Sequence, residues 1–214
     1  MAHGDAPRRV WYAAYGSNLH WPRFRCYLQG GRAPGGSRVH APCADRRPPR
    51  AQAAATLPFP LFFAGRSPTW GGGNAFVDPT RRDARTLARL YLVTAEQFAG
   101  IAAGEAHRKR VRLPPARAAT SSWYRFAPGA YGVVVRCGQR GGLPIVTVTG
   151  PPVDARVAWP RPRYLTTIVA GLTETHRLSA SAAADYLAGV PGVWGHYARR
   201  DLVALVSGES PAAT

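Results

Sequence analysis

Acidic residues are scarce in this 214-residue chain: 11 Asp and Glu stand against 28 Lys and Arg, giving a formal net charge of +17. Such a charge is typical of nucleic-acid-binding proteins. Yet only Lys109 is a lysine, and the arginines are scattered through a chain rich in Ala, Gly and Pro, which indicates a GC-rich coding sequence. No recognition helix, zinc-finger spacing or aromatic-basic motif accompanies them. Nucleic-acid binding is therefore not the predicted main role.

Cysteine and long apolar runs are also scarce. Cys26, Cys43 and Cys137 are widely spaced and odd in number, which suits a reduced compartment better than a disulfide framework. No apolar run approaches the roughly 20 residues of a membrane span, and the first 11 residues contain no signal-like segment. We expect a cytoplasmic protein with no membrane partner.

Metal-binding spacings are missing as well. The six histidines form no HxxxH or HxH pair, and the cysteines form no CxxC. Those spacings are what zinc sites commonly use. Neither a zinc deacetylase nor a metalloprotease is predicted, and no cofactor is expected.

The size and composition fit one globular unit. A chain of this length buries roughly 70% of its extended surface as a single domain, and 46% of its residues are hydrophobic. We predict one domain over 1–214, with flexible ends at 1–9 and 208–214 and a partly ordered Gly/Pro-rich excursion at 30–58. No internal repeat or second core is evident. The oligomeric state, monomer or homodimer, stays open.

Local patterns predict strands and helices without βαβ regularity, which indicates an α+β fold. Strands are expected at 10–15, 57–63, 74–77, 86–93, 123–126, 131–136 and 145–149. Helices are expected at 21–29, where Gly30 stops the helix, and at 94–105, 163–172 and 179–187. Thr94 with Gln97 forms a capping box, and Ser179 is an N-cap.

The helix that Thr94 opens carries the most informative residue. Phe98, Ile101 and Glu105 share one face by their spacing, so this glutamate, one of only four in the chain, projects inward at the end of an apolar stripe. Burial of a carboxyl group raises its pKa, which suits a general base. A structural ion pair with an arginine, or fraying of the helix end, stays open. If Glu105 acts as a base, its pocket is expected to exclude guanidinium groups.

A second feature is the turn Tyr15-Gly16-Ser17-Asn18-Leu19, which follows the first predicted strand. Such a turn exposes consecutive backbone N–H groups that suit an anion nest or oxyanion hole. It is neither a nucleophile elbow nor a Walker loop. By itself the turn is also compatible with an ordinary connecting turn that has no functional role.

Together, the turn and the inward glutamate resemble the γ-glutamylcyclotransferase family. Further likeness lies in Trp70-Gly71-Gly72, in the spacing from Leu90–Val93 to Glu105, and in a late helix. The segment that resembles this helix contains Tyr164, Leu165, Ile168, Gly171 and Leu178. The likeness extends, with gaps, from about Val10 to Leu187.

The resemblance implies a mixed β-barrel or sheet flanked by a few helices, and a metal-free enzyme. Members of the family convert a γ-glutamyl amine into 5-oxoproline and a free amine, the substrate's own α-amino group attacking the γ-carbonyl. By resemblance Glu105 is the catalytic base. The glutamyl pocket and its backbone donors would come from Tyr15, Gly16, Ser17, Asn18 and Leu19, with Tyr164 reaching the site.

Several departures accompany this resemblance. Ala106 follows Glu105 where many relatives have glycine, and the 30–58 excursion is longer than a minimal member needs. The strand tyrosine expected ahead of Tyr164 has no counterpart at 146–150. Some family members remove γ-glutamyl protecting groups in specialised-metabolite biosynthesis, a use that the GC-rich, bacterial-like composition fits. Acyl transfer, amide hydrolysis, and a non-catalytic arginine-rich binding module remain alternatives.

Three neighbouring residues have expected structural roles. His20 lies close to the turn but is expected to be structural. His107, two positions after Glu105, would face elsewhere on a continuing helix. Trp70 is expected to pack a glycine-rich turn rather than line a ligand site.

Overall fold

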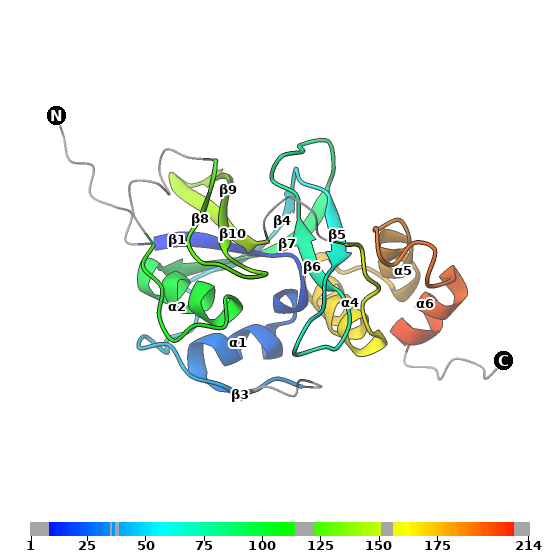
Figure 1. Cartoon of the computed structure of the whole chain (residues 1–214), viewed down its shortest axis with the longest axis horizontal. Helices are drawn as coiled ribbons and strands as arrows, with labels where there is room; N and C mark the ends of the chain where they lie inside the picture. Colours follow the sequence, from blue (N-terminus) through cyan, green and yellow to red (C-terminus); the bar gives the residue numbers. More distant parts are fainter. Residues whose placement is uncertain (1–8, 35, 37–38, 114–121, 151–155, 208–214) are drawn as a thin grey trace.

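The computed structural model describes residues 9–34, 36, 39–113, 122–150 and 156–207 (Figure 1). The ends predicted to be flexible lie outside this range, except for Arg9, which begins the first strand. A six-stranded sheet has the order β4-β7-β1-β10-β9-β8. Its strands are β4 (Gln52–Leu57), β7 (Thr86–Thr94), β1 (Arg9–Ala14), β10 (Leu143–Thr149), β9 (Val133–Arg140) and β8 (Trp123–Arg125).

The sheet is mixed. Strand β1 runs parallel to β10 and antiparallel to β7, and the other neighbours are antiparallel. The helices are α1 (Trp21–Gln29), α2 (Ala95–Glu105), α4 (Pro162–His176), α5 (Ala180–Ala188) and α6 (Arg199–Ser207). Helices α2 and α4 pack on the sheet, α1 packs on α2, and α5 and α6 pack on α4. The predicted α+β class is confirmed.

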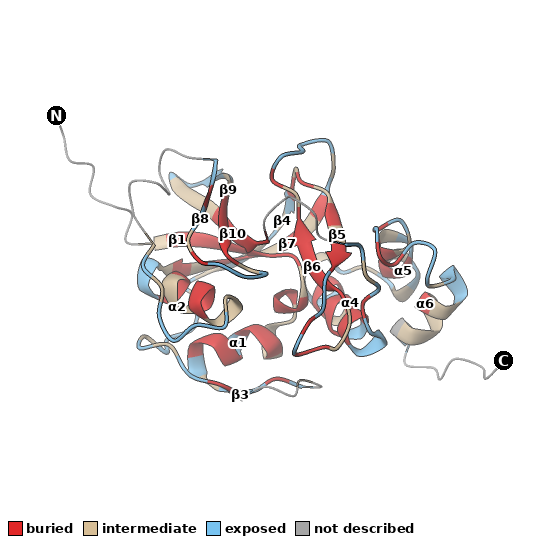
Figure 2. Ribbon diagram, in the orientation of Figure 1, coloured by how far each residue is buried: buried red, intermediate tan, exposed pale blue. Residues whose placement is uncertain are grey.

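Alternation along β1 separates two hydrophobic clusters, where the sequence suggested no second core. Tyr12 belongs to a cluster covered by α1 and α2, and Trp11 belongs to a cluster that includes side chains of α4, α5 and α6. Successive strand residues point to opposite faces of a sheet, so one buried strand contributes to both. Figure 2 shows the buried residues concentrated on the sheet and the inner helix faces.

A hairpin extends the structure beside β10. Strands β5 (Leu61–Ala64) and β6 (Asn74–Val77) pair antiparallel, and the Val77 N–H donates to Thr149 Oγ1 at 3.1 Å. Between them, a Cβ at Gly73 would collide with the carbonyl oxygen of Ala158. The glycine-rich turn therefore allows two backbone segments to touch.

The described residues of the region 30–58 include regular strands that the sequence did not predict. It contains β2 (Gly31–Arg32), β3 (Val39–His40) and the whole of β4, which is an edge strand of the main sheet. Strand β4 is rich in alanine, so it lacks the alternation of large apolar and polar residues that signals a strand.

The terminal signals of three helices are confirmed. Helix α1 ends at Gly30, the Thr94–Gln97 capping box opens α2, and Ser179 caps α5. Helix α6 was not predicted. None of the helices in the described residues is long and apolar enough to cross a membrane.

Candidate active site

A pocket of about 580 Å³, including its opening to solvent, lies where the end of β1, α1, the end of α2, β10, α4 and the β5–β6 hairpin meet. It collects residues that are far apart in the sequence. The lining residues are Tyr12, Tyr15, Gly16, Ser17, Asn18, Arg23, Tyr27, Ser67, Thr69, Trp70, Asn74, Ala75, Gly104, Glu105, His107, Tyr131, Val148 and Tyr164.

The predicted turn forms one wall of this pocket. Ser17–Leu19 is a short 3₁₀ turn, in which the Leu19 N–H donates to Gly16 O at 3.0 Å and the His20 N–H donates to Ser17 O at 3.2 Å. The first N–H groups of such a turn are not used by its own hydrogen bonds. Leu19 does not line the pocket: its fully buried side chain belongs to the core, because a large apolar group here packs against α4.

Glu105 is the last residue of α2 and reaches the same pocket. Asn18 Nδ2 donates to Glu105 Oε1 at 2.7 Å and to Tyr12 Oη at 3.0 Å. Burial, together with the charge of Glu105, holds the pKa of Tyr12 well above its ordinary value. The structure thus joins the turn to the helix-borne carboxylate by a direct hydrogen bond.

An arginine lines this pocket, contrary to the expectation that guanidinium groups are excluded. Arg23 on α1 is 4% exposed. Its Nη2 donates to Tyr27 Oη at 3.3 Å, and its Nη1 lies 3.0 Å from His40 Nε2. Since a guanidinium only donates, His40 Nε2 accepts. Burial lowers the pKa of Arg23, but the interactions with Tyr27 and Glu105 outweigh it, so the pKa is raised.

Tyr164 forms another wall, together with Trp70. The two rings stack with centroids 5.1 Å apart, and the Ala75 N–H donates to Tyr164 Oη at 3.3 Å. Trp70 is buried in the glycine-rich turn as predicted, but it also lines the pocket. Tyr131, whose hydroxyl donates to Ala75 O at 2.7 Å, lies nearby; no sequence pattern singled it out.

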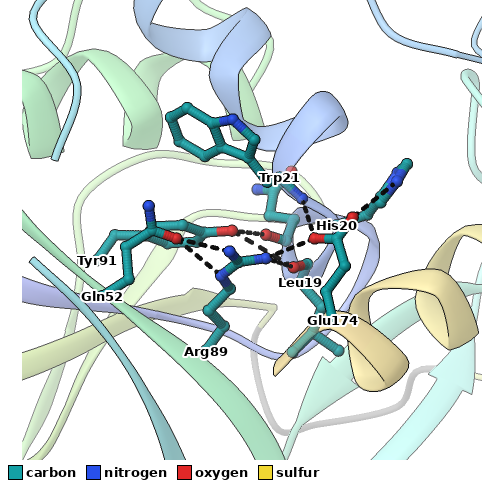
Figure 3. Close-up of polar contacts among 8 residues, drawn as sticks. Leu19, His20, Trp21, Gln52, Arg89, Tyr91 and Glu174 are labelled. Carbon is teal, nitrogen blue, oxygen red and sulfur yellow. Dashed lines mark hydrogen bonds and ion pairs between the residues drawn. The ribbon is translucent and has the colours of Figure 1, made fainter. Parts of the chain in front are cut away.

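A polar network behind the pocket holds the turn from outside (Figure 3). Glu174 of α4 accepts from the Trp21 N–H at 3.0 Å and from Arg89 Nη1 at 2.7 Å. The same Arg89 nitrogen donates to Leu19 O at 2.9 Å, and the Tyr91 hydroxyl donates to Asn18 O at 2.8 Å. These bonds attach the backbone of the turn to both the sheet and α4.

The two histidines near the site behave differently from each other. His20 pairs with Glu174 at 3.2 Å, outside the pocket lining, so its expected structural role agrees with the structure. His107 was expected to face away, and that is wrong. Helix α2 ends at Glu105, and His107 adopts φ 54°, which turns it to the pocket.

Within the described part of the chain, no group of three or more His, Cys, Asp or Glu side chains could hold a metal ion. Cys26, Cys43 and Cys137 are all free thiols.

No family model matches the chain. It is 32% identical over 205 residues to histone deacetylase 5 of Arabidopsis thaliana, a match that covers 83% of this chain and 30% of that protein. The chain thus spans less than a third of the length of this curated relative.

Two solved structures resemble the whole arrangement. One is a γ-glutamyl cyclotransferase, with a TM-score of 0.51, 16% identity, and coverage of 94% of this chain and 99% of that chain. The other is an uncharacterised human protein, with a TM-score of 0.50, 16% identity and the same coverage. The chain has the γ-glutamyl cyclotransferase fold, and the resemblance seen in the sequence is confirmed at the level of the fold.

Proposed function

We propose that the chain is a γ-glutamylcyclotransferase-like enzyme that releases 5-oxoproline and a free amine from a γ-glutamyl amine. One observation carries the proposal: Glu105 accepts a hydrogen bond from Asn18 inside a pocket that Gly16, Ser17 and Tyr164 also line. The carboxylate and the turn come from elements 87 residues apart. Their meeting in one pocket supports a shared chemical task.

The proposed reaction needs a base, a folded substrate and an oxyanion site. Glu105 takes a proton from the substrate ammonium, and the freed amine attacks the γ-carbonyl, forming the ring C–N bond. The carbonyl oxygen becomes an oxyanion beside the N–H groups of Ser17 and Asn18. The amide C–N bond then breaks. Over the reaction two protons pass from the attacking nitrogen to the leaving nitrogen, with Glu105 as the relay.

The surroundings of Glu105 suit this relay. Tyr12 and Tyr27 stay neutral hydroxyls, because burial is the first cause that raises the pKa of each. They can therefore donate or accept hydrogen bonds without adding negative charge beside the carboxylate. Holding the attacking nitrogen near the carbonyl supplies the entropic part of the acceleration.

The test is a panel of γ-glutamyl amines assayed for 5-oxoproline. Glu105→Gln should lower kcat by about 10²- to 10⁴-fold, the usual contribution of a general base. Glu96→Gln is the matched control, since Glu96 is exposed on the same helix. A Glu105→Gln variant with full activity would contradict the assignment of the base. The absence of 5-oxoproline from every panel member would contradict the function itself.

Amide hydrolysis is the second candidate function. It is favoured by the similarity to an Arabidopsis protein named histone deacetylase 5, because deacetylation hydrolyses an amide. The same panel separates the two reactions. Hydrolysis would release glutamate in place of 5-oxoproline, and acyl transfer would leave a new γ-glutamyl amide.

We further propose a small-molecule substrate, a cytoplasmic site of action, and a deprotection step in biosynthesis as the use. Screening bulky and small leaving amines in the panel addresses that use.

A further inference from the structure

Two buried polar atoms in the pocket have no hydrogen-bond partner within the described structure: Arg23 Nε and Asn18 Oδ1. One is a donor and the other is an acceptor. Arg23 and Asn18 are each 4% exposed, and both line the pocket. Most buried polar groups in proteins are satisfied, so this donor and this acceptor are available to a ligand in the pocket. The other two unpaired atoms, Tyr124 Oη and Thr175 Oγ1, belong to residues outside the pocket lining.

The environment of Arg23 indicates the charge of that ligand. Two groups that contact the guanidinium are neutral: the His40 ring, which accepts through Nε2, and the Tyr27 hydroxyl, whose pKa is raised first by burial. The anion whose charge acts on Arg23 is Glu105, the carboxylate that the proposed reaction uses as its base. A buried cation is costly unless an anion compensates it. A guanidinium forms its strongest hydrogen bonds with carboxylates and phosphates.

Asn18 indicates the opposite end of the ligand. Its Nδ2 is already used by Tyr12 and Glu105, which leaves Oδ1 as an acceptor beside the Glu105 carboxylate. An ammonium group, with three donors, complements an amide oxygen and a carboxylate. The pocket therefore has a cationic part at Arg23 and an acceptor part at Asn18 and Glu105.

We infer that Arg23 is a specificity residue that binds the α-carboxylate of the substrate, while Asn18 Oδ1 and Glu105 receive its α-ammonium. The pocket then selects an unblocked α-amino acid head and rejects amides that lack the carboxylate. The inference rests on the proposed function for the identity of the substrate, and it assigns the part of the site that distinguishes a glutamyl group from other acyl groups.

A pair of substrates that differ only in the carboxylate tests this. The best γ-glutamyl amine of the panel is compared with the corresponding 4-aminobutanoyl amide, which can cyclise to 2-pyrrolidinone by the same chemistry. We expect wild type to prefer the glutamyl substrate by about 10- to 100-fold in kcat/KM, the range of one hydrogen bond to a charged group. Arg23→Gln should reduce that preference to near one, through a larger loss of kcat/KM with the glutamyl substrate than with the 4-aminobutanoyl amide.

Two further variants serve as controls for Arg23→Gln. Arg25→Gln removes the same charge from the exposed face of α1 and should keep the wild-type preference. Arg23→Lys, which retains the charge but not the planar fork, should keep part of it. A preference that survives Arg23→Gln overturns the inference, as does an equal loss with both substrates in a variant that melts like wild type.

Isothermal calorimetry tests the inference through ligand affinity, with neither a variant nor catalytic turnover. Wild type should bind 5-oxo-L-proline at least 10-fold more tightly than 2-pyrrolidinone, and equal affinities would overturn the inference. If no γ-glutamyl amine yields 5-oxoproline, the proposed function fails by itself. Arg23-dependent binding of 5-oxo-L-proline would still support the carboxylate site in that case.

Discussion

Tyr164 and Tyr186 carry the same kind of hydrogen bond in two different places. The Tyr164 hydroxyl accepts from the Ala75 N–H at the pocket, and the Tyr186 hydroxyl accepts from the Leu87 N–H away from it. Burial raises the pKa of each to about 12, so both are neutral at any physiological pH. Any difference between them therefore comes from location.

Tyr164→Phe should lower the free energy of unfolding by about 1–3 kcal/mol, because it leaves the Ala75 N–H without its acceptor. It should also raise KM, because Ala75 lines the pocket and its N–H loses the hydroxyl that fixes it. Tyr186→Phe should cost similar stability without a change in KM. Urea unfolding and steady-state kinetics on both variants check this, and a matching KM increase in Tyr186→Phe would refute the local role.

At the level of single residues, sequence reasoning found the groups whose neighbours in the chain identify them. Helical spacing predicted that Glu105 points inward, and the turn after the first strand singled out Asn18. Arg23 was missed because an arginine-rich composition hides one arginine that is buried. His107 was misplaced because its orientation depends on where α2 ends, and the left-handed residue that ends the helix there is a histidine rather than a glycine. Such contacts depend on tertiary packing, not on local pattern.

At the level of elements, α4 positions the turn through Glu174. This side chain contacts the Trp21 N–H, Arg89 and His20 at once (Figure 3). The helix can approach closely enough because residue 171 is a glycine: a Cβ there would collide with the backbone of Leu19. The turn is thus fixed by α4 on one side and by β7 on the other.

Glu174→Gln should weaken this support, because the neutral amide loses the charge that holds Arg89 and His20. We expect the free energy of unfolding to fall by about 1 kcal/mol, a modest value because the group is partly exposed. The value of kcat should fall several-fold with little change in KM, since the backbone donors of the turn act on the transition state. Glu96→Gln, far from the network, should change neither. A variant in which KM alone changes would argue against a positioning role.

The elements themselves were predictable to different degrees. Strand β1 and helices α1, α2 and α5 have strong local signals, namely apolar runs, a stopping glycine, a capping box and a serine cap. Strand β4 has none, because alanine gives little β preference and its place is set by pairing with β7. The residues just before helix α6, His196 to Ala198, include none of the usual N-cap types, and the helix packs on α5.

At the level of the whole molecule, two histidines lie where α4 packs against β7 and against the turn Ser17–Leu19. We call this contact region the seam. His176 contacts Ala88 O of β7 at 3.0 Å, and His20 contacts Glu174 at 3.2 Å. Burial is the main cause that lowers the pKa of both below the ordinary value of about 6.5. Protonation is therefore harder in the folded protein than in the unfolded chain.

The sign of the pH dependence follows directly. Between the lowered pKa values of the folded protein and about 6.5, the unfolded chain binds more protons, so the free energy of unfolding rises with pH in this window. We expect urea unfolding to show lower stability at pH 5.5 than at pH 7.5. The carboxylates Asp45, Asp83 and Asp185 have pKa values lowered by hydrogen bonds from arginine partners, so their contribution is lost only at more acidic pH.

A double variant, His20→Gln with His176→Gln, should flatten the dependence between pH 5.5 and 7.5. Stability that stays constant or increases on acidification of wild type would contradict the assignment. Because the same seam fixes the turn that lines the pocket, acidification should also reduce kcat before the protein unfolds. If kcat and the folded fraction instead fall together at every pH, acidification does not disturb the seam before the whole protein unfolds.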